Sequence, residues 1–273
     1  MHMTQAIAFI GGGNMASAII GGLLKQGLPA QNILVVEPFE EARAKLKELF
    51  GIAALSAPDA SLERAGLVVW AVKPQTFKDA ALQTKAFTAK ALHLSVAAGI
   101  RSDSIAAWLG SERIIRCMPN TPALIGRGIT ALVAREGVSA ADRQWAGEVI
   151  ATTGQFLWLE REDQLDAVTA ISGSGPAYMF YFMEAMTAAG TEMGLNAKQA
   201  YQLAVATFIG AGELAQASAD SPEVLRQRVT SKGGTTYAAI SSMDESGIKA
   251  SFAKALHAAR DRAKEMGDAF GKA

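Results

Sequence analysis

A glycine-rich turn near the start of the chain has the residues and the spacing that bind a pyrophosphate. Gly11, Gly13 and Ala16 form the pattern Gly-x-Gly-x-x-Ala between an apolar run and a helix-like segment. The first glycine permits a tight turn, the second lets the backbone approach a phosphate, and the small third residue allows close helix–sheet packing. Free N–H groups at the start of the helix would bind the phosphates. The alternative is a strand–helix turn without a ligand, but the strand before the pattern and the helix after it favour a dinucleotide site.

An acidic residue follows at the distance expected for contact with a nucleotide ribose. Glu37 ends the second apolar run, 24 positions after Gly13. A carboxylate there accepts hydrogen bonds from the adenosine 2′-hydroxyl and repels a 2′-phosphate, which favours NADH over NADPH. The alternative is an exposed loop acid, and the nearby Arg43 complicates the preference. Both cofactors therefore stay open at this stage.

Alternating apolar and amphipathic segments predict a parallel α/β sheet over roughly the first 160 residues. Strands are expected at 6–10, 32–37, 67–72, 92–96, 113–118, 128–134 and 154–159, with helices at 16–26, 39–50, 76–88, 102–109 and 140–150. Ser102 is the expected N-cap of the fourth of these helices. Ligands bind outside the carboxyl ends of such strands, so the loops at 71–74, 97–99 and 117–121 are expected at the site.

The alternation stops after Asp163. From there the chain reads as helices at 176–190, 197–217, 222–229, 237–244 and 249–270. We therefore predict a Rossmann-type, doubly wound dinucleotide-binding domain over 1–163 and an all-α domain over 164–273. Small residues at four-residue spacing, Ala206 and Gly210 with Leu214 beyond them, would allow close helix packing.

Composition excludes several other classes of protein. The 26 Lys and Arg balance the 26 Asp and Glu, whereas nucleic-acid-binding domains usually carry a basic excess. The single cysteine cannot form a disulfide within the chain. With only three histidines beside it, a metal centre is not expected. Cys117 is interpreted as a buried thiol in an apolar strand and not as a nucleophile. No apolar stretch is long enough for a membrane span and no signal peptide is recognised, so a cytoplasmic enzyme is expected.

Three further glycine clusters lie later in the chain. At Gly233-Gly234-Thr235-Thr236 one helix ends and another begins, so free N–H groups and hydroxyls could bind an anion the size of a carboxylate. A plain helix–helix corner is the alternative. Gly173 to Gly175 marks the start of the all-α half, and Gly126 to Gly128 has no assignable ligand.

Taken together, six segments resemble the pyrroline-5-carboxylate reductase family over essentially the whole chain. They are residues 9–23, 68–75, 95–100, 114–128, 165–178 and 225–245, the last of which is similar to the signature of that family. The resemblance implies hydride transfer from NADPH or NADH to the C=N bond of 1-pyrroline-5-carboxylate, giving L-proline in the last step of proline biosynthesis. It also implies that the all-α half forms an intertwined homodimer and that dimers assemble further into decamers.

The resemblance assigns roles to individual positions. Thr236 is the implied catalytic residue, beside the ring nitrogen of the substrate. The implied substrate-binding residues are Glu162, Ser231, Gly233, Gly234, Thr235 and Thr236. The implied cofactor-binding residues, with Glu37 added from the reasoning above, are Gly11, Gly12, Gly13, Asn14, Met15, Ala71, Val72, Lys73, Pro74, Val96 and Ala98. No metal is implied.

The expected chemistry needs little from side chains. A cyclic imine is basic enough to react as its iminium, so holding the nicotinamide over the imine carbon would supply most of the catalysis. Thr236 would then be a hydrogen-bonding and proton-relay residue and not a strong base. One departure from the family pattern is Lys232, where proline is common, and this puts the shape of the loop in doubt.

Other functions are weighed against this one. An imine or β-hydroxyacid reductase of similar architecture would usually carry a catalytic Lys or Asp on the interdomain helix, where this chain has only Glu184. A non-catalytic dinucleotide-binding protein would not need the carboxylate loop at 233–236. A structural scaffold would need no cofactor loops.

Overall fold

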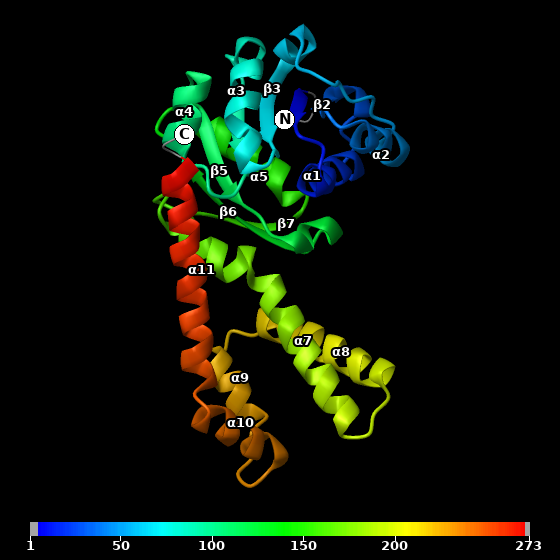
Figure 1. Cartoon of the computed structure of the whole chain (residues 1–273), viewed down its shortest axis with the longest axis vertical. Coiled ribbons are helices and arrows are strands. Elements are labelled where there is room, and N and C mark those ends of the chain that lie inside the picture. Colours follow the sequence, from blue (N-terminus) through cyan, green and yellow to red (C-terminus); the bar gives the residue numbers. More distant parts are fainter. Residues whose placement is uncertain (1–4, 271–273) are drawn as a thin grey trace. The chain divides into compact units, whose positions relative to one another are not determined.

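A computed structural model describes residues 5–270, and the chain divides into two compact units (Figure 1). The first unit comprises the residues up to Ser174 together with those from Ala259 onward, and the second comprises Gly175–Ala258. The first contains all the strands and the second is helical. This confirms the expected fold class, an α/β sheet domain followed by a mostly helical part.

The first unit is built on one seven-stranded sheet with the strand order β2-β1-β3-β4-β5-β6-β7. The strands are β1 (Ala6–Ile10), β2 (Ile33–Val36), β3 (Ala65–Trp70), β4 (Leu92–Ser95), β5 (Ile114–Met118), β6 (Gly128–Ala134) and β7 (Gly154–Trp158). All neighbours pair in parallel except β5 and β6, which are antiparallel. Because the chain leaves β1 toward β2 on one side and then reaches β3 on the other, the topological switch point lies between β1 and β3, where such folds bind ligands.

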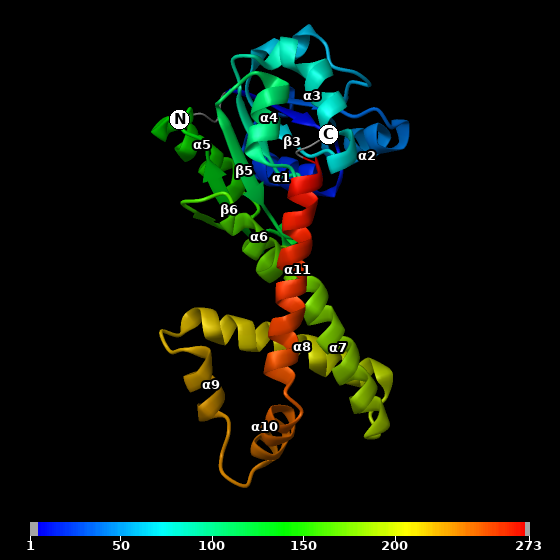
Figure 2. The same ribbon diagram turned by 60° about the vertical axis from the view of Figure 1, so that its left-hand side comes forward.

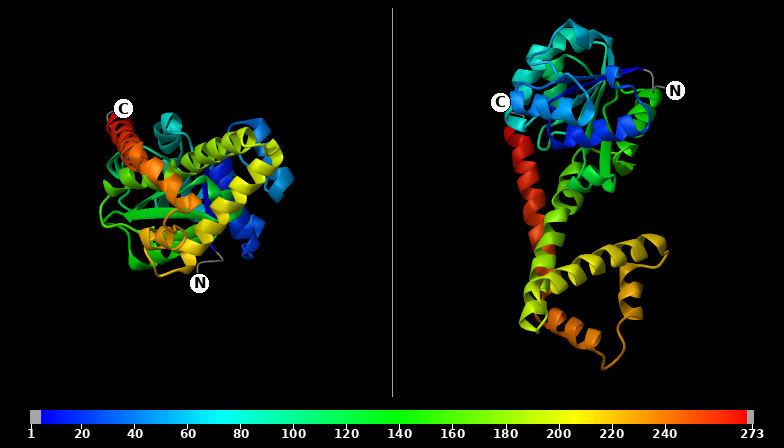
Figure 3. Two further views of the ribbon diagram at one scale, coloured as in Figure 1. Left: turned by 90° about the horizontal axis from the view of Figure 1, so that it is seen from below. Right: turned by 90° about the vertical axis from the view of Figure 1, so that its right-hand side faces the viewer.

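Helices cover both faces of the sheet (Figure 3). They are α1 (Asn14–Lys25), α2 (Glu40–Phe50), α3 (Pro74–Thr88), α4 (Ser102–Leu109), α5 (Ala140–Ala151) and the short α6 (Gln164–Val168). Ile19 of α1 and Val149 of α5 belong to one buried cluster with Phe9. Phe77 of α3 belongs to a second cluster with the next strand residue, Ile10. Successive side chains of a strand point to opposite faces, which explains the uninterrupted apolar runs of the central strands.

The end of α11 (Ile248–Phe270) packs in the first unit, beside the start of α4 (Figure 2). A Cβ placed on Gly267 would lie 2.6 Å from Nε of Arg101, so α11 passes close to the Arg101 side chain and a larger residue would have to displace it. Met266 lies 3.3 Å from the corresponding Cβ position of Gly99. The last turns of the chain therefore complete the first unit.

The second unit consists of α7 (Gly175–Glu192), α8 (Ala197–Ala217), α9 (Pro222–Arg228), α10 (Thr235–Glu245) and the first part of α11. Asn196 begins α8 with a capping box to Gln199, which satisfies two backbone groups reciprocally. Gly190 allows α7 and α8 to approach, because a Cβ there would lie 2.9 Å from Cβ of Ala200. The ring of Phe252 on α11 packs edge-on against α7.

The small residues at 206 and 210, which were expected to allow close helix packing, do not form the contact between α7 and α8 within this chain. The approach of α7 to α8 is made by Gly190, Ala200 and Ala204, whereas nothing lies within 4 Å of a Cβ placed on Gly210. Large apolar side chains on these helices are exposed, among them Phe180, Tyr181, Leu203, Ile209 and Leu214. The stripe at Ala206, Gly210 and Leu214 therefore lies on an open face of the unit.

The compact units differ from the predicted domain limits of 1–163 and 164–273 in two places. The residues from 164 to 174 stay with the sheet, because α6 packs against β5 and β6 and its Leu165 is buried. A π-helical turn, Thr169–Gly173, follows α6 and was not anticipated. The chain also returns to the first unit at Ala259. Contacts between residues distant in sequence, and not a change of composition, set both limits.

One local expectation is wrong, and one glycine cluster that had no assigned role receives a structural explanation. Ser102 is not the N-cap of α4, because Arg101 holds that position and Ser102 is the first helical residue. The glycines at 126–128 have a structural explanation: Gly126 ends a 3₁₀ turn with φ +71°, and a Cβ on Gly128 would lie 2.9 Å from the backbone of Ala123. No helix among residues 5–270 is long and apolar enough to cross a membrane.

A buried histidine, His93, contacts Trp70 in the apolar cluster that contains Phe77. Nε1 of Trp70 donates a hydrogen bond to Nδ1 of His93 at 3.2 Å, and both side chains are buried. Burial lowers the pKa of His93 from 6.5 to about 4, with a smaller contribution from the positive charge of Arg113. The imidazole is therefore neutral in the folded protein at pH values where it is charged in the unfolded chain.

This predicts a pH-dependent stability that belongs to one residue. Between pH 6.5 and about pH 4 the unfolded chain binds a proton that the folded protein does not, so the free energy of unfolding falls as the pH falls. The contribution of His93 is about 3 kcal/mol over this window. Denaturant unfolding of wild type and His93→Gln, which keeps an acceptor for Trp70, should give curves that converge toward pH 4. Parallel curves would contradict the prediction.

Candidate active site

The glycine turn lies at the switch point of the sheet, between the ends of β1 and β3. Gly11 has φ +94°, and a Cβ there would lie 2.6 Å from the carbonyl oxygen of Ala71. The N–H of Gly11 donates to the carbonyl of Val36 at 2.8 Å, and the N–H of Ala71 donates to the carbonyl of Ile10 at 2.8 Å. Only glycine meets both demands at position 11. The tight turn predicted from the sequence is present.

The next part of the turn leaves room for a phosphate. Gly13 is the N-cap of α1, and no atom lies within 4 Å of a Cβ placed on it. The first N–H groups of α1, from Asn14 and Met15, have no acceptor within the helix. Ala16 is fully buried, which brings α1 close to the sheet. Open space over a helix N-terminus fits the pyrophosphate of a dinucleotide.

Glu37 is a buried carboxylate that holds this turn. Its side chain accepts hydrogen bonds from the N–H of Gly12 at 2.8 Å and from the N–H of Phe39 at 3.0 Å. The residue is 6% exposed, so the alternative of an exposed loop acid is wrong. Arg43 donates to the carbonyls of Glu37 and Pro38 and makes no ion pair with the carboxylate. Each carboxylate oxygen can accept more than one hydrogen bond, which leaves room for a ribose hydroxyl.

The other predicted cofactor loops lie beside the glycine turn. Lys73 is the N-cap of α3 and Pro74 is its first residue, so the chain after β3 turns directly into a helix. The N–H of Val96 donates to the carbonyl of Trp70 at 3.1 Å, which joins the loop after β4 to the end of β3. Val72 and Ala98 are in these same two loops. The fold therefore gathers the predicted cofactor residues at one edge of the sheet.

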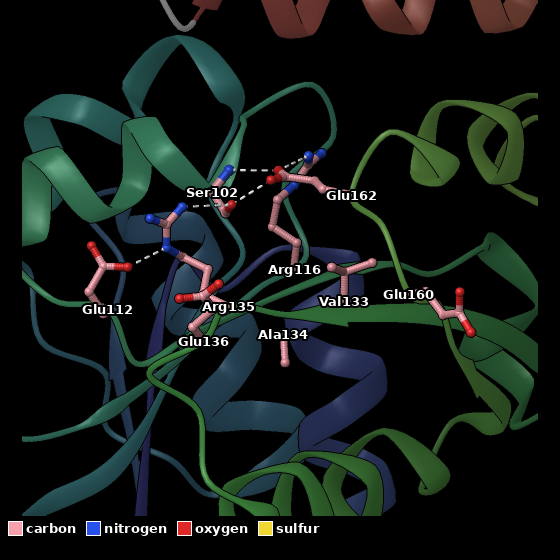
Figure 4. Close-up of a pocket in the computed structure, with 9 residues that line it drawn as sticks. All are labelled: Ser102, Glu112, Arg116, Val133, Ala134, Arg135, Glu136, Glu160 and Glu162. Carbon is pink, nitrogen blue, oxygen red and sulfur yellow. Dashed lines mark hydrogen bonds and ion pairs between the residues drawn. The ribbon is translucent and has the colours of Figure 1, made fainter.

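A second cluster surrounds Glu162, in the loop between β7 and α6. It borders a cavity of about 300 Å³ (Figure 4), which is lined by Ser102, Glu112, Arg116, Val133, Ala134, Arg135, Glu136, Glu160 and Glu162. The carboxylate accepts hydrogen bonds from the N–H of Ser102 at 2.7 Å and from its hydroxyl at 2.5 Å. It also forms an ion pair with Nη1 of Arg116 at 2.5 Å. Glu162 is thus held from two elements, α4 and β5.

The surroundings keep Glu162 ionised. Burial by itself raises the pKa of the carboxyl group, but the charge of Arg116 and the hydrogen bonds from Ser102 and Arg116 outweigh it, and the pKa is lowered. Cys117, the next residue along β5, is buried and its pKa is raised by burial, which agrees with an unreactive core thiol. Glu162 is therefore ionised at the cavity, whereas the thiol of Cys117 is neutral and buried.

The remaining predicted substrate residues belong to the second unit. Gly233 has φ +77°, and Gly234 is the N-cap of α10, with its N–H bonded to the carbonyl of Ser231 at 3.0 Å. Thr235 and Thr236 are the first residues of α10, as predicted, so their N–H groups have no acceptor in the helix. The turn keeps its left-handed glycine with lysine at position 232. It has the backbone of a small anion site.

Sequence reasoning missed Ser102, Arg116 and Arg135. Arg116 had one signal, a positive charge inside the otherwise apolar strand β5. Ser102 was interpreted as a helix cap, but its hydroxyl donates to Glu162 instead. Arg135 follows β6 and donates to the Ser102 hydroxyl at 3.1 Å. These contacts join residues 33 or more positions apart, which no local pattern indicates.

Comparison with known proteins gives the family. A model described as pyrroline-5-carboxylate reductase dimerisation matches residues 162–266, and one described as NADP oxidoreductase coenzyme F420-dependent matches residues 6–99. The pyrroline-5-carboxylate reductase of Pseudomonas aeruginosa is 46% identical over 272 residues, covering 98% of this chain and 99% of that protein. The chain belongs to the pyrroline-5-carboxylate reductase family. The Haemophilus influenzae member is 41% identical, with 96% of this chain and 97% of that protein covered.

Solved structures agree with this assignment. The reductase from Coxiella burnetii matches with a TM-score of 0.90 and 37% identity, covering 96% of this chain and 98% of that one. The Plasmodium falciparum member, solved with NADP bound, matches with a TM-score of 0.86 and 26% identity over the same shares. A reductive aminase from Aspergillus terreus has a TM-score of 0.58 and 20% identity, and it shares the fold alone. The expected family and its fold are therefore confirmed.

A change at Gly13 tests the phosphate site of this family member without disturbing the protein. Because nothing occupies the Cβ position, Gly13→Ala should cost less than about 1 kcal/mol of stability. It should weaken NADH binding at least tenfold, about 1.4 kcal/mol, because the methyl group would meet the phosphate. Fluorescence titration with NADH measures this. Gly21→Ala, in the same helix with only ordinary contacts, is the control, and equal affinities for the two variants would refute the site.

Proposed function

We propose that this chain reduces 1-pyrroline-5-carboxylate to L-proline, the last step of proline biosynthesis, with hydride from NADH or NADPH. The observation that carries the proposal is the match to the Pseudomonas aeruginosa reductase across 98% of the chain. A match of that extent includes both the glycine turn and the loop at 231–236. Hydride goes to the C=N carbon, the ring nitrogen keeps its proton as the positive charge is discharged, and a secondary amine leaves.

In this proposal the first unit binds the cofactor, which supplies the hydride when bound. Gly11, Gly12, Gly13, Asn14 and Met15 take the pyrophosphate, and the loops with Ala71, Val72, Lys73, Pro74, Val96 and Ala98 hold the rest of the dinucleotide. The support is the open helix N-terminus at Gly13 and the joined loops after β1, β3 and β4. The chain thereby fixes one reactant in place, which is the larger part of the catalysis.

The substrate residues proposed are Glu162 and the turn formed by Ser231, Gly233, Gly234, Thr235 and Thr236. Free N–H groups at the start of α10 suit the substrate carboxylate, since the helix dipole favours an anion there. The hydroxyl of Thr236 would hydrogen-bond the ring nitrogen, and it would pass a proton to that nitrogen where the imine arrives unprotonated. The ionised Glu162 would favour a cationic iminium.

The assembly follows from the same family. The dimerisation match over residues 162–266 covers the whole second unit, whose α7 and α8 expose large apolar side chains. A cavity of about 710 Å³ lies along this face, bordered by Phe180, Met183 and Tyr201 among others. A homodimer that covers this surface is proposed, with assembly into decamers as the family resemblance implies. A cytoplasmic location stays a prediction.

Replacing Thr236 tests the reaction and the catalytic role together. With wild type, NADH oxidation should depend on added 1-pyrroline-5-carboxylate, and Thr236→Ala should lower kcat about 100-fold, as loss of a proton-relaying group does. Thr236→Ser, which keeps the hydroxyl, should keep most of the activity, and both variants should unfold as wild type does. No turnover by wild type would remove the proposed reaction. Full turnover by Thr236→Ala would remove only the residue.

Replacing Glu37 tests the cofactor preference. The carboxylate of Glu37 is buried after β2, and the first turn of the following helix, α2, adds two more acids, Glu40 and Glu41. We expect NADH to serve at least as well as NADPH. Glu37→Gln should raise the ratio of kcat/KM for NADPH to that for NADH about tenfold. A strong NADPH preference in wild type that the substitution leaves unchanged would show that Glu37 plays no part.

A further inference from the structure

We propose that Arg116 and Ser102 are positioning residues that fix the orientation and the charge of the Glu162 carboxylate at the wall of its cavity. This inference rests on the proposed function, because it concerns how Glu162 serves the substrate. Neither residue belongs to the sites proposed for substrate or cofactor. Both act through Glu162, and Arg135 supports Ser102 from behind.

The contacts determine how the carboxylate lies. One oxygen of Glu162, Oε1, receives both the N–H of Ser102 at 2.7 Å and Nη1 of Arg116 at 2.5 Å. The other oxygen, Oε2, accepts the hydroxyl of Ser102 at 2.5 Å. With both oxygens engaged by donors on two different elements, the plane of the carboxylate is fixed. Ser102 also begins α4, so the anion lies at the positive end of that helix dipole.

The burial of Arg116 is difficult to explain by stability. Its side chain is 6% exposed and lies in a strand whose neighbours Ile114, Ile115 and Cys117 are buried. Its Nε is buried without a hydrogen-bond partner, so the guanidinium is only partly satisfied. An ion pair with one buried partner must offset the desolvation of that charge, and a buried pair is often no more stable than apolar residues of the same size. The strand therefore contains a charge that is costly to bury, and among residues 5–270 its ion-pair partner is Glu162.

Ser102 is itself oriented by a further contact. Nη1 of Arg135 donates to the hydroxyl oxygen of Ser102 at 3.1 Å, so the hydroxyl proton is left to point at Glu162 (Figure 4). Arg135 is fixed in turn by Glu112 at 2.7 Å and by Asp103. Arg135 therefore donates to the Ser102 hydroxyl, and this hydroxyl in turn donates to Glu162.

Other charged groups surround the cluster without bonding to Glu162. Arg101 at the start of α4 pairs with Asp166 of α6 at 2.9 Å and lies 3.9 Å from Asp268 of α11. Further acidic groups nearby are Asp103 of α4, Glu160 and Asp163 of the same loop as Glu162, and Glu112 and Glu136 of the cavity wall. The further cations are Arg161, which pairs with Asp163 at 3.0 Å, Arg113 before β5, which pairs with Asp142 at 2.7 Å, and Lys264 of α11, which pairs with Asp268. Among the described residues, Arg116 is thus the one cation that forms an ion pair with Glu162.

The charge of Glu162 follows from this arrangement. Burial favours the neutral acid, and Arg116 with Ser102 reverses that preference. Removing the guanidinium leaves the burial uncompensated, so the pKa of Glu162 must rise and the carboxylate must be lost at a higher pH. In the proposed reaction an ionised Glu162 stabilises a cationic ring, so activity should fall on the acidic side together with this ionisation.

The experiment compares pH profiles of kcat/KM for 1-pyrroline-5-carboxylate in five proteins: wild type, Arg116→Met, Arg116→Lys, Ser102→Ala and Glu160→Gln. Relative to wild type, the acidic limb should move to higher pH by about one unit in Arg116→Met and by less in Ser102→Ala. Arg116→Lys should restore most of the wild-type position, because it returns the charge. Glu160→Gln, which removes a carboxylate from the same cavity wall, should leave the limb in place.

Two further measurements separate the possible failures. NADH affinity and thermal unfolding are measured on each variant and show whether the first unit is intact. If Arg116→Met does not fold, Ser102→Ala still allows the comparison, because it removes only a hydroxyl group. An inactive wild type would defeat the proposed function and not this inference. The inference would be overturned if wild type is active and the acidic limb of the kcat/KM profile lies at the same pH in Arg116→Met or Ser102→Ala as in wild type. It would also be overturned if Arg116→Lys shifts this limb as far as Arg116→Met does.

Discussion

The contact between Gly11 and the carbonyl of Ala71 is the constraint on which the cofactor half of this protein depends. The backbone after β1 comes so close to the backbone after β3 that a Cβ at position 11 would lie 2.6 Å from an oxygen. This approach joins the two loops on either side of the switch point. It also sends the chain into α1 with Gly13 facing open space. The strand order, the geometry of the turn and the open space over the start of α1 therefore depend on one another.

The buried carboxylate of Glu37 and the half-buried carboxylate of Glu162 are held by the same physical means. Glu37 accepts backbone N–H groups from Gly12 and Phe39, and Glu162 accepts the N–H of Ser102 at the start of α4. A carboxylate loses its hydration on burial and must recover it from donors of the protein. Glu37 recovers it from neutral amides only, whereas Glu162 also has the guanidinium of Arg116. The first thereby braces a loop, and the second brings a fixed charge to a cavity.

The second unit leaves much of its apolar surface uncovered in the single chain. Its helices pack at Gly190 against Ala200 and around Phe252, but much of the apolar surface of α7 and α8 is exposed. Exposed apolar surface of this extent is typical of an interface between proteins. The dimerisation match over these residues gives that surface a physical reason. The small residues at 206 and 210 then belong to the same open face.

The sequence by itself determined the alternation of strands and helices, the glycine turn and the start of α10 at Thr235. These features depend on neighbouring residues, because buried parallel strands need continuous apolar runs and tight turns need glycine. Only the tertiary structure decided that α6 and the end of α11 belong with the sheet, that Glu37 is turned inward, and that Ser102 and Arg116 meet Glu162. Each of these depends on partners that the fold, and not the local sequence, brings together.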